Sequence, residues 1–115
     1  MSTDCIFCKI AKGEISAKKV YEDDHFFAFH DIAPQAPVHV LVIPKEHIAT
    51  LDDLTPQNAA RIGEMTVLIS RLARDLGLVE GGYRVVTNCG EGAGQSVFHI
   101  HYHLLGGRPM NWPPG

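Results

Sequence analysis

Seven residues near the carboxyl end decide how this chain folds: Phe98-His99-Ile100-His101-Tyr102-His103-Leu104. Histidine and apolar side chains alternate strictly here, which is the pattern of a β-strand with two different faces. On such a strand, side chains two positions apart lie about 6.6 Å from each other. The alternation therefore predicts a strand over residues 98–104 with three imidazoles on one face and Ile100, Tyr102 and Leu104 toward the core.

Four other stretches are rich in apolar and β-branched residues and predict further strands. Two of them flank the pair Asp23-Asp24, which predicts a hairpin, and a third, expected at the centre of the sheet, stops at Pro44. These predicted strands cover residues 18–22, 25–29, 38–43 and 83–87. Hairpins without crossover helices indicate an antiparallel sheet.

Two segments show helical spacing of apolar residues. Thr55-Pro56 offers an N-cap followed by proline, and apolar residues then recur every three or four positions, which predicts a long helix over residues 56–76 that Gly77 ends. A short N-terminal helix is predicted to end near Gly13. The sequence thus predicts a single α+β domain over residues 1–115, with an antiparallel sheet of about five strands, one long helix and a short N-terminal helix.

The composition excludes several classes of partner. Of the 115 residues, 45% are hydrophobic and 20% charged, with a net charge of -3, as in an ordinary globular domain. Basic residues form no stripe, so we expect no nucleic-acid partner. No apolar run approaches the roughly 20 residues that cross a bilayer, and the stretch 1–10 lacks an apolar signal core. We therefore expect no membrane partner and a location in the cytoplasm.

The row of histidines supports two kinds of site. Imidazoles spaced in this way can bind zinc, or one of them can act as a nucleophile. A catalytic zinc site needs a carboxylate nearby, yet no Asp or Glu lies between Gly92 and Met110. The glycine-rich stretch 88–96 precedes the row instead, and its backbone N–H groups can form a cradle for an anion. A phosphate is therefore the expected ligand, whose phosphorus a neutral imidazole can attack.

The same region resembles the signature of the histidine triad (HIT) superfamily: Gln95-Ser96-Val97-Phe98-His99-Ile100-His101-Tyr102-His103-Leu104-Leu105. The resemblance extends over nearly the whole chain and is greatest to the Hint branch. Its other matching segments are Cys5–Phe7, Phe29–Ile32, His39–Lys45 and Leu105–Gly115. Members of this branch are purine nucleoside phosphoramidases, which cleave the P–N bond of adenosine or guanosine phosphoramidates and release the nucleoside monophosphate. The resemblance implies that activity here.

The resemblance also implies a role for each matching residue. His101 is the expected nucleophile and becomes nucleotidylated, while His103 and His39 orient it and relay protons. His99 supports His101 from the adjoining position, and Ser96 protonates the leaving nitrogen. Asp31 matches the residue that binds the ribose hydroxyls, since one carboxylate can accept from both members of a diol. Apolar residues implied to enclose the purine are Ile6, Phe7, Ile10, Phe29 and Ile32, and those implied to contact ribose or phosphate are Asn88, Gly94, Gln95, Ser96, His101 and His103.

The resemblance to the Hint branch also implies a second subunit, and it leaves alternative activities to be considered. Hint proteins are homodimers, so the resemblance implies a dimer in which the long helix supplies much of the interface and the segment around Trp112 reaches toward the partner's site. One alternative is the dinucleoside polyphosphate hydrolase branch, which Ser96 and the ending Trp112-Pro113-Pro114-Gly115 disfavour. Others are a nucleotide-binding interaction protein with incidental catalysis and a hydrolase with catalytic zinc.

The three cysteines argue against a disulfide framework, because their number is odd and the expected compartment is reducing. Cys5 and Cys8 match relatives that hold a structural zinc on two cysteines and two histidines, which correspond to His47 and His99. Four protein ligands leave no open position, so such a zinc would stabilise the fold and take no part in the chemistry. The alternatives are two reduced thiols or, less favoured, a redox pair. His30 is expected to be a surface or packing histidine.

Overall fold

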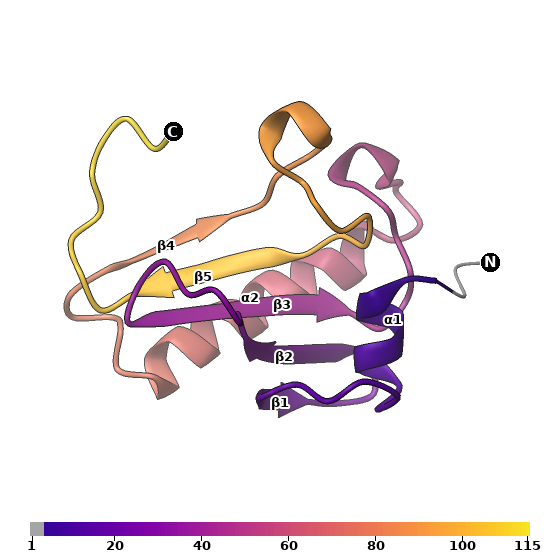
Figure 1. Cartoon of the computed structure of the whole chain (residues 1–115), viewed down its shortest axis with the longest axis horizontal. Helices are drawn as coiled ribbons and strands as arrows, with labels where there is room; N and C mark the ends of the chain where they lie inside the picture. Colours follow the sequence, from indigo (N-terminus) through magenta and orange to yellow (C-terminus); the bar gives the residue numbers. More distant parts are fainter. Residues whose placement is uncertain (1–3) are drawn as a thin grey trace.

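Five antiparallel strands form one sheet in the computed structural model, which describes residues 4–115 and so leaves the first three residues of the predicted domain outside it. The order across the sheet is β1-β2-β3-β5-β4 (Figure 1). The strands are β1 (Lys19–Glu22), β2 (Phe26–His30), β3 (Val38–Pro44), β4 (Tyr83–Val86) and β5 (Tyr102–Gly106). The helices are α1 (Ile6–Ala11) and α2 (Ala59–Asp75), with 3-10 turns η1 (Leu51–Asp53) and η2 (Glu91–Ala93). The predicted α+β class is confirmed.

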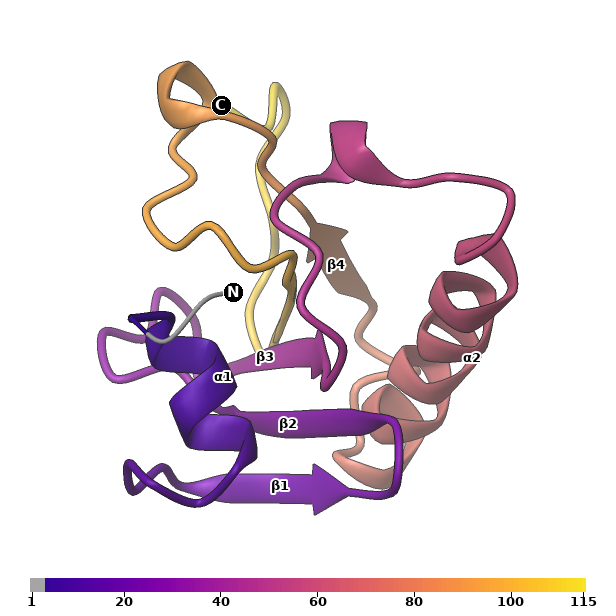
Figure 2. The same ribbon diagram turned by 90° about the vertical axis from the view of Figure 1, so that its right-hand side faces the viewer.

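The two helices cover opposite faces of the sheet (Figure 2). The central strand β3 is buried on both faces, which is why its sequence is an almost continuous β-branched run. Val40 and Val42 point toward α2, while Leu41 and Ile43 point toward α1. Because side chains alternate along a strand, His39 lies on the α1 face with Leu41. The sheet therefore presents His39, and also His103 opposite Leu41, on the side away from the long helix.

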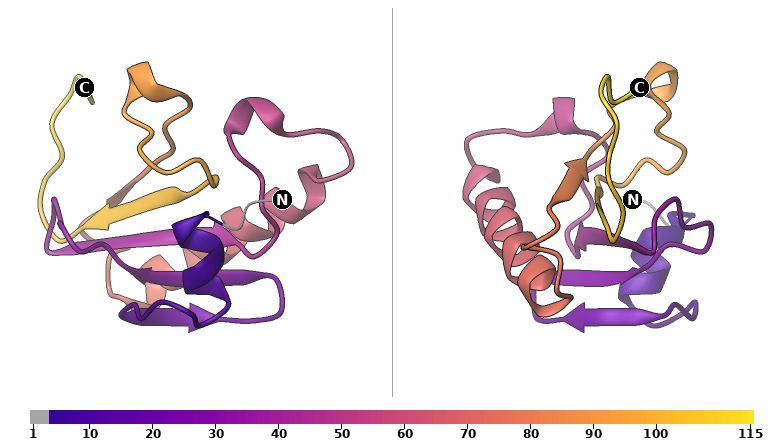
Figure 3. Two further views of the ribbon diagram at one scale, coloured as in Figure 1. Left: turned by 45° about the vertical axis from the view of Figure 1, so that its right-hand side comes forward. Right: turned by 90° about the vertical axis from the view of Figure 1, so that its left-hand side faces the viewer.

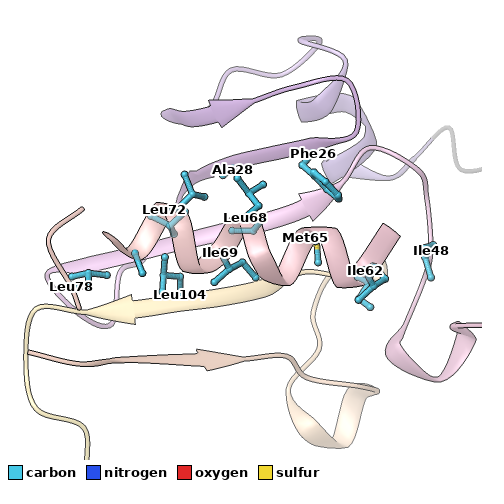
Figure 4. Packing of buried hydrophobic residues seen from close by; sticks show 14 residues of the cluster. Phe26, Ala28, Ile48, Ile62, Met65, Leu68, Ile69, Leu72, Leu78 and Leu104 are labelled. Carbon is cyan, nitrogen blue, oxygen red and sulfur yellow. The ribbon is translucent and has the colours of Figure 1, made fainter. Parts of the chain in front are cut away.

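The larger core lies between α2 and the sheet (Figure 4). Apolar residues of α2 recur at helical spacing, and Met65, Ile69 and Leu72 are at most 3% exposed. They pack against Val40, Val42 and Leu104 from the sheet, together with Phe26 and Ile100. Within residues 4–115, no helix is long and apolar enough to cross a membrane.

The predicted strand over residues 98–104 is wrong at its start, because β5 begins only at Tyr102. The backbone before it bonds to loops and not to a neighbouring strand. Ile100 N donates to Ile48 O over 2.6 Å, and His101 O accepts from the Thr87 hydroxyl over 2.8 Å. The predicted alternation still places Ile100 and Leu104 in the core beside α2.

The predicted start of the long helix is also displaced, from position 56 to Ala59. Thr55 N donates to Asn58 Oδ1 over 2.8 Å, and Asn58 N donates to Thr55 O, so residues 55–58 form a turn ahead of the helix.

After β5 the chain leaves the sheet beside the start of β4 and continues as an extended segment (Figure 3). Arg84 of β4 holds this segment through a 2.9 Å hydrogen bond to Asn111 O.

Candidate functional site

The histidines meet on the α1 face, where β3 and β5 lie side by side. His39 Nε2 is 2.9 Å from His103 Nδ1, and the rings of His101 and His103 have centroids 5.1 Å apart. Phe7 of α1 packs edge to face against His101 with a centroid distance of 5.0 Å. His101 is 7% exposed and His39 5% exposed. Two members of the row predicted from the sequence, His101 and His103, therefore form a connected group that His39 extends from the neighbouring strand, whereas the ring of His99 faces Cys5 and Cys8.

A backbone carbonyl determines which nitrogen of His101 carries a proton. His101 Nδ1 lies 2.8 Å from His99 O, and a carbonyl oxygen can only accept, so Nδ1 donates. In the neutral ring the lone pair is then on Nε2. The backbone of the adjacent histidine thus holds His101 in the tautomer whose free nitrogen can act as a nucleophile.

The neutral His39 ring carries its proton on Nε2, the opposite nitrogen from His101. Gln35 N donates to His39 Nδ1 over 3.0 Å, so the proton of the neutral ring is on Nε2. That N–H points at His103 Nδ1 and lies 3.4 Å from Asp31 Oδ2. His103 consequently accepts at Nδ1 and carries its own proton on Nε2. This arrangement forms a directed chain of hydrogen bonds from Gln35 through His39 to His103.

Burial keeps this pair of histidines neutral. The pKa of His103 is lowered to about 4, mainly by desolvation and then by the neighbouring His101 and His39, while Asp31 opposes the shift. Desolvation likewise lowers the pKa of His39, against the opposing charge of Asp31. Both rings are therefore uncharged at neutral pH, as a proton relay between them requires.

A largely apolar groove of about 880 Å³ opens beside the histidines between α1, β2 and the loop after it. Asp31 and His39 are among the residues that line the groove, and so is Ile32, which is fully exposed. The implied purine-binding residues that line it are Ile6, Ile10, Phe29 and Ile32. Phe7 is 7% exposed and does not line it, because its ring packs beneath against Phe29 and His101.

The glycine-rich stretch forms a compact loop around η2 and does not line this groove. Gly90 and Gly94 have φ of 91° and 95°, which glycine adopts without strain. Gln95 is 3% exposed and fastens the loop: its Oε1 accepts from Gly90 N, and its Nε2 donates to Ala49 O and Val97 O. The Gln95 amide nitrogen has no proton left for a ligand, whereas Gly94 and Ser96 are exposed and Asn88 is half-buried.

Cys5, Cys8, His47 and His99 form a second cluster, whose ligand atoms all lie within 4.8 Å of one another. His99 Nδ1 is 3.4 Å from both thiols and 3.2 Å from His47 Nδ1, and Cys8 Sγ is 3.3 Å from His47 Nδ1. In a tetrahedral zinc site, ordinary bond lengths place two nitrogens about 3.3 Å apart and nitrogen and sulfur about 3.6 Å apart. The observed distances fit, so this cluster could hold a metal ion.

The tautomer of His99 suits a metal ligand. Its Nε2 donates to Pro44 O over 2.7 Å, which leaves the Nδ1 lone pair aimed at the thiols. Burial lowers the pKa of His99 to about 4, so the ring is neutral. Without a cation, burial and the neighbouring Cys5 raise the pKa of Cys8 to about 11, and a bound cation would favour the thiolate.

Asp31, His39 and His103 also lie within 4.8 Å of one another, but their protons do not suit a metal. A metal at His39 Nε2 would displace the proton that the Gln35 hydrogen bond places there. His39 and His103 therefore fit a proton relay better than a pair of metal ligands.

About half of the residues that line the groove were not predicted from the sequence. Its unpredicted lining residues are Ile15, Ser16, Ala17, Lys18, His30, Pro34 and Pro37. Most of them come from irregular segments, in which no periodicity indicates where a side chain points. His30, expected at the surface or in packing, is exposed and lines the groove because it ends β2 directly before Asp31.

Comparison with known proteins places the chain in a family. The HIT domain model matches residues 12–110. An uncharacterized HIT-like protein of Synechococcus elongatus is 53% identical over 115 residues, the full length of both chains. Purine nucleoside phosphoramidase of Escherichia coli K12 is 44% identical over 110 residues, 96% of this chain and 92% of that protein.

The fold has equally similar solved counterparts. A HIT family hydrolase from Legionella pneumophila superposes with a TM-score of 0.96 at 53% identity, covering 97% of this chain and all of that one. A histidine triad protein from Clostridium difficile superposes with a TM-score of 0.92 at 46% identity, covering 95% of each chain. Together with the connected histidines on β3 and β5, these likenesses establish that the chain belongs to the HIT family.

Proposed function

We propose that this chain is a hydrolase that cleaves the P–N bond of purine nucleoside phosphoramidates through a nucleotidyl-histidine intermediate. The observation that carries the proposal is the tautomer of His101, whose Nδ1 donates to His99 O and whose Nε2 keeps its lone pair. The 44% identity to a purine nucleoside phosphoramidase supports this choice of substrate. The apolar groove beside Asp31 has the chemistry to hold a nucleoside, because its walls suit a purine and its carboxylate suits a ribose diol.

The first step forms a bond between His101 Nε2 and phosphorus as the P–N bond breaks. The electron pair of that bond leaves on the nitrogen, which takes a proton from the Ser96 hydroxyl, and the amine departs. His103, held by His39 and carrying its proton on Nε2, donates to a phosphoryl oxygen. In the second step water attacks phosphorus, the electron pair returns to His101 Nε2, and a water proton restores Ser96. The products are the amine and the nucleoside monophosphate.

We also propose that the chain binds a structural zinc ion, held by Cys5, Cys8, His47 and His99. Two sulfur and two nitrogen donors at tetrahedral spacing suit zinc and fill its coordination. Zinc here supplies fold stability and no step of the reaction. The three free cysteines fit a reducing compartment, so we keep the cytoplasm as the proposed location.

A homodimer completes the proposal. Val67 on α2 is 69% exposed, and Val85 on the edge strand β4 is 41% exposed. An edge strand with unpaired backbone groups and apolar side chains favours pairing with another chain. A second copy is the partner that the Hint resemblance implies for this surface.

Rapid quenching tests the mechanism. The protein is mixed with adenosine 5'-phosphoramidate, quenched within milliseconds and examined by mass spectrometry of its peptides. We expect a nucleotidyl adduct on His101, and loss of the adduct together with at least a thousandfold loss of turnover in His101→Ala. His25→Ala, which removes an exposed histidine outside the groove, is the matched control and should react normally. Normal turnover by His101→Ala would overturn the mechanism.

A further inference from the structure

The chain that follows β5 lies against the loop over residues 31–37, which joins β2 to β3. Val38 at the start of β3 pairs with Gly106 at the end of β5, so the residues after Gly106 meet the loop that precedes β3. A Cβ added to Gly107 would lie 2.9 Å from Pro37 Cβ, and Gly107 has a φ of 91°. A glycine allows both this close approach and this backbone conformation. The segment after β5 therefore contacts the loop at a fixed place.

Arg108 joins these two segments through hydrogen bonds. Its Nε and Nη2 both donate to Gln35 O, over 3.1 Å and 2.9 Å, and its Nη1 donates to Pro109 O over 2.9 Å. Because the guanidinium plane is rigid and charged, it presents two well-oriented donors to a single carbonyl oxygen. The position of the Gln35 backbone is therefore tied to the segment that follows β5.

Gln35 passes this restraint on to His39. The residue whose carbonyl accepts from Arg108 also donates its own N–H to His39 Nδ1, over 3.0 Å. Pro34 and Pro37 flank this part of the loop, and each has a fixed φ, so few backbone dihedrals are free here. Holding the Gln35 carbonyl therefore also restrains the direction of the Gln35 N–H.

The Gln35 N–H decides which nitrogen of His103 carries a proton. With the His39 proton on Nε2, His103 accepts at Nδ1 and keeps its own proton on Nε2. If the His39 proton moved to Nδ1, the bond between the rings would run in the opposite direction, and His103 Nε2 would have no proton to donate. That proton is the one given to a phosphoryl oxygen, so this step rests on the proposed function. We propose that Arg108 is a positioning residue for this relay, because it holds the N–H that keeps both histidines in these tautomers.

The Asp31 end of the loop is held by bonds of its own. Asp31 Oδ1 accepts from Ala33 N over 2.8 Å, and Asp31 N donates to His39 O over 2.9 Å. Removal of the Arg108 guanidinium should therefore leave Asp31, the proposed ribose ligand, in place. The loss should appear in kcat and not in KM, whereas general loosening of the loop would also raise KM.

Kinetics and NMR of arginine variants test this inference. Turnover of adenosine 5'-phosphoramidate and the ¹⁵N shifts of the histidine ring nitrogens are measured for the wild type, Arg108→Met and Arg108→Lys. Arg84→Met is the matched control, because Arg84 also bonds to the C-terminal segment, at Asn111 O. We expect Arg108→Met to lower kcat about tenfold, since only part of the proton-transfer contribution is lost. The loss is partial because Asp31 Oδ2, 3.4 Å from His39 Nε2, still favours a proton there.

The ring nitrogens show whether the change in kcat has the proposed cause. In Arg108→Met we expect His39 to be partly protonated at Nδ1, in Arg108→Lys an intermediate result in both measurements, and in Arg84→Met wild-type behaviour. Unchanged ring nitrogens in Arg108→Met would overturn the inference, as would a raised KM at unchanged kcat.

An equal decrease of kcat in Arg84→Met would also overturn the inference, because loosening of the C-terminal segment would then explain the effect. Failure of the wild type to turn over the phosphoramidate would overturn the proposed function instead. The ring nitrogens of the ligand-free protein would still test whether Arg108 positions His39.

Discussion

At the scale of single residues, His99 connects the two histidine-containing clusters. Its Nδ1 faces the thiols of Cys5 and Cys8, its Nε2 donates to Pro44 O, and its backbone oxygen accepts from His101 Nδ1. The ring is completely buried. One residue therefore offers its side chain to the candidate metal and its carbonyl to the proposed nucleophile, so the position of the cluster also positions the reacting nitrogen.

The neutral pair His39 and His103 predicts a pH dependence of stability. The pKa of His103 is about 4 in the folded protein, below its ordinary value of about 6.5 in the unfolded chain. Between these values the unfolded chain binds more protons, so stability is complete above about pH 6.5 and is lost as the pH falls toward 4. We expect the urea midpoint of the wild type to decrease from pH 7 to pH 5.

His103→Asn isolates this contribution. The variant lacks one of the titrating rings, so its midpoint should change less between pH 7 and pH 5 than that of the wild type. Protons taken up at the Cys5 and His99 cluster affect both proteins alike and cancel in the comparison. Equal slopes for the two proteins would show that His103 is already protonated in the fold, contrary to the expected neutral ring.

Gly106 is required by its contact with Leu78. A Cβ added to Gly106 would lie 2.7 Å from Leu78 Cδ2 and 2.8 Å from Leu78 Cδ1, and Leu78 is 4% exposed. We expect Gly106→Ala to destabilise the protein by about 1–3 kcal/mol in urea unfolding. Gly63→Ala is the matched control, since its Cβ meets open space on α2, and should stabilise by about 0.5–1 kcal/mol. A neutral Gly106→Ala would show that Leu78 moves aside freely.

At the scale of elements, α1 depends on what lies at its first turn. The helix has six residues, too few to be stable alone, and only Phe7 and Ile10 anchor it in the core. Cys5 caps its N-terminus, accepting from Cys8 N over 3.3 Å, and both thiols face His99. A metal on this cluster would therefore fasten α1, with the groove wall that it carries, to the segment before β5.

Removal of the metal should lower the melting temperature of the protein. An ion at a thousandfold excess over its dissociation constant stabilises a fold by about 4 kcal/mol, which corresponds to a shift on the order of 10 °C for a chain of this size. Dialysis against a chelator should produce this shift in thermal melts, and added zinc should reverse it. Cys8→Ser should melt at the lower temperature and respond to neither treatment, while Cys89→Ser should behave like the wild type. An unchanged melting temperature on chelation would contradict the zinc proposal.

Elements that bond to regular neighbouring strands or helices could be predicted from the sequence, whereas an element that bonds to a distant loop could not. The β1–β2 hairpin, β3 and α2 were predictable, because their patterns reflect burial against regular neighbours. The start of β5 was not, since Ile100 bonds to Ile48 in a distant loop. The histidine group and the Cys5 cluster could be proposed from spacing and resemblance. The groove lining at Ile15, Ser16 and Ala17 could not, because an irregular segment between α1 and β1 supplies it.

At the scale of the whole molecule, the surface of α2 and the β4 edge predicts self-association. In the wild type we expect a mass twice the 12.6 kDa of one chain by sedimentation equilibrium at micromolar concentration. Val67→Lys places a charge on an apolar side chain that is 69% exposed, and burial of an unpaired ammonium in an interface is costly.

The variant should therefore sediment as a monomer without losing helix content by circular dichroism. Val79→Lys is the matched control, as Val79 is 53% exposed but lies in the connection between α2 and β4, and it should remain dimeric. A wild type that sediments as a monomer would contradict the proposed homodimer. A dimer that survives Val67→Lys would place the interface away from this part of α2, with the β4 edge at Val85 as the surface to change next.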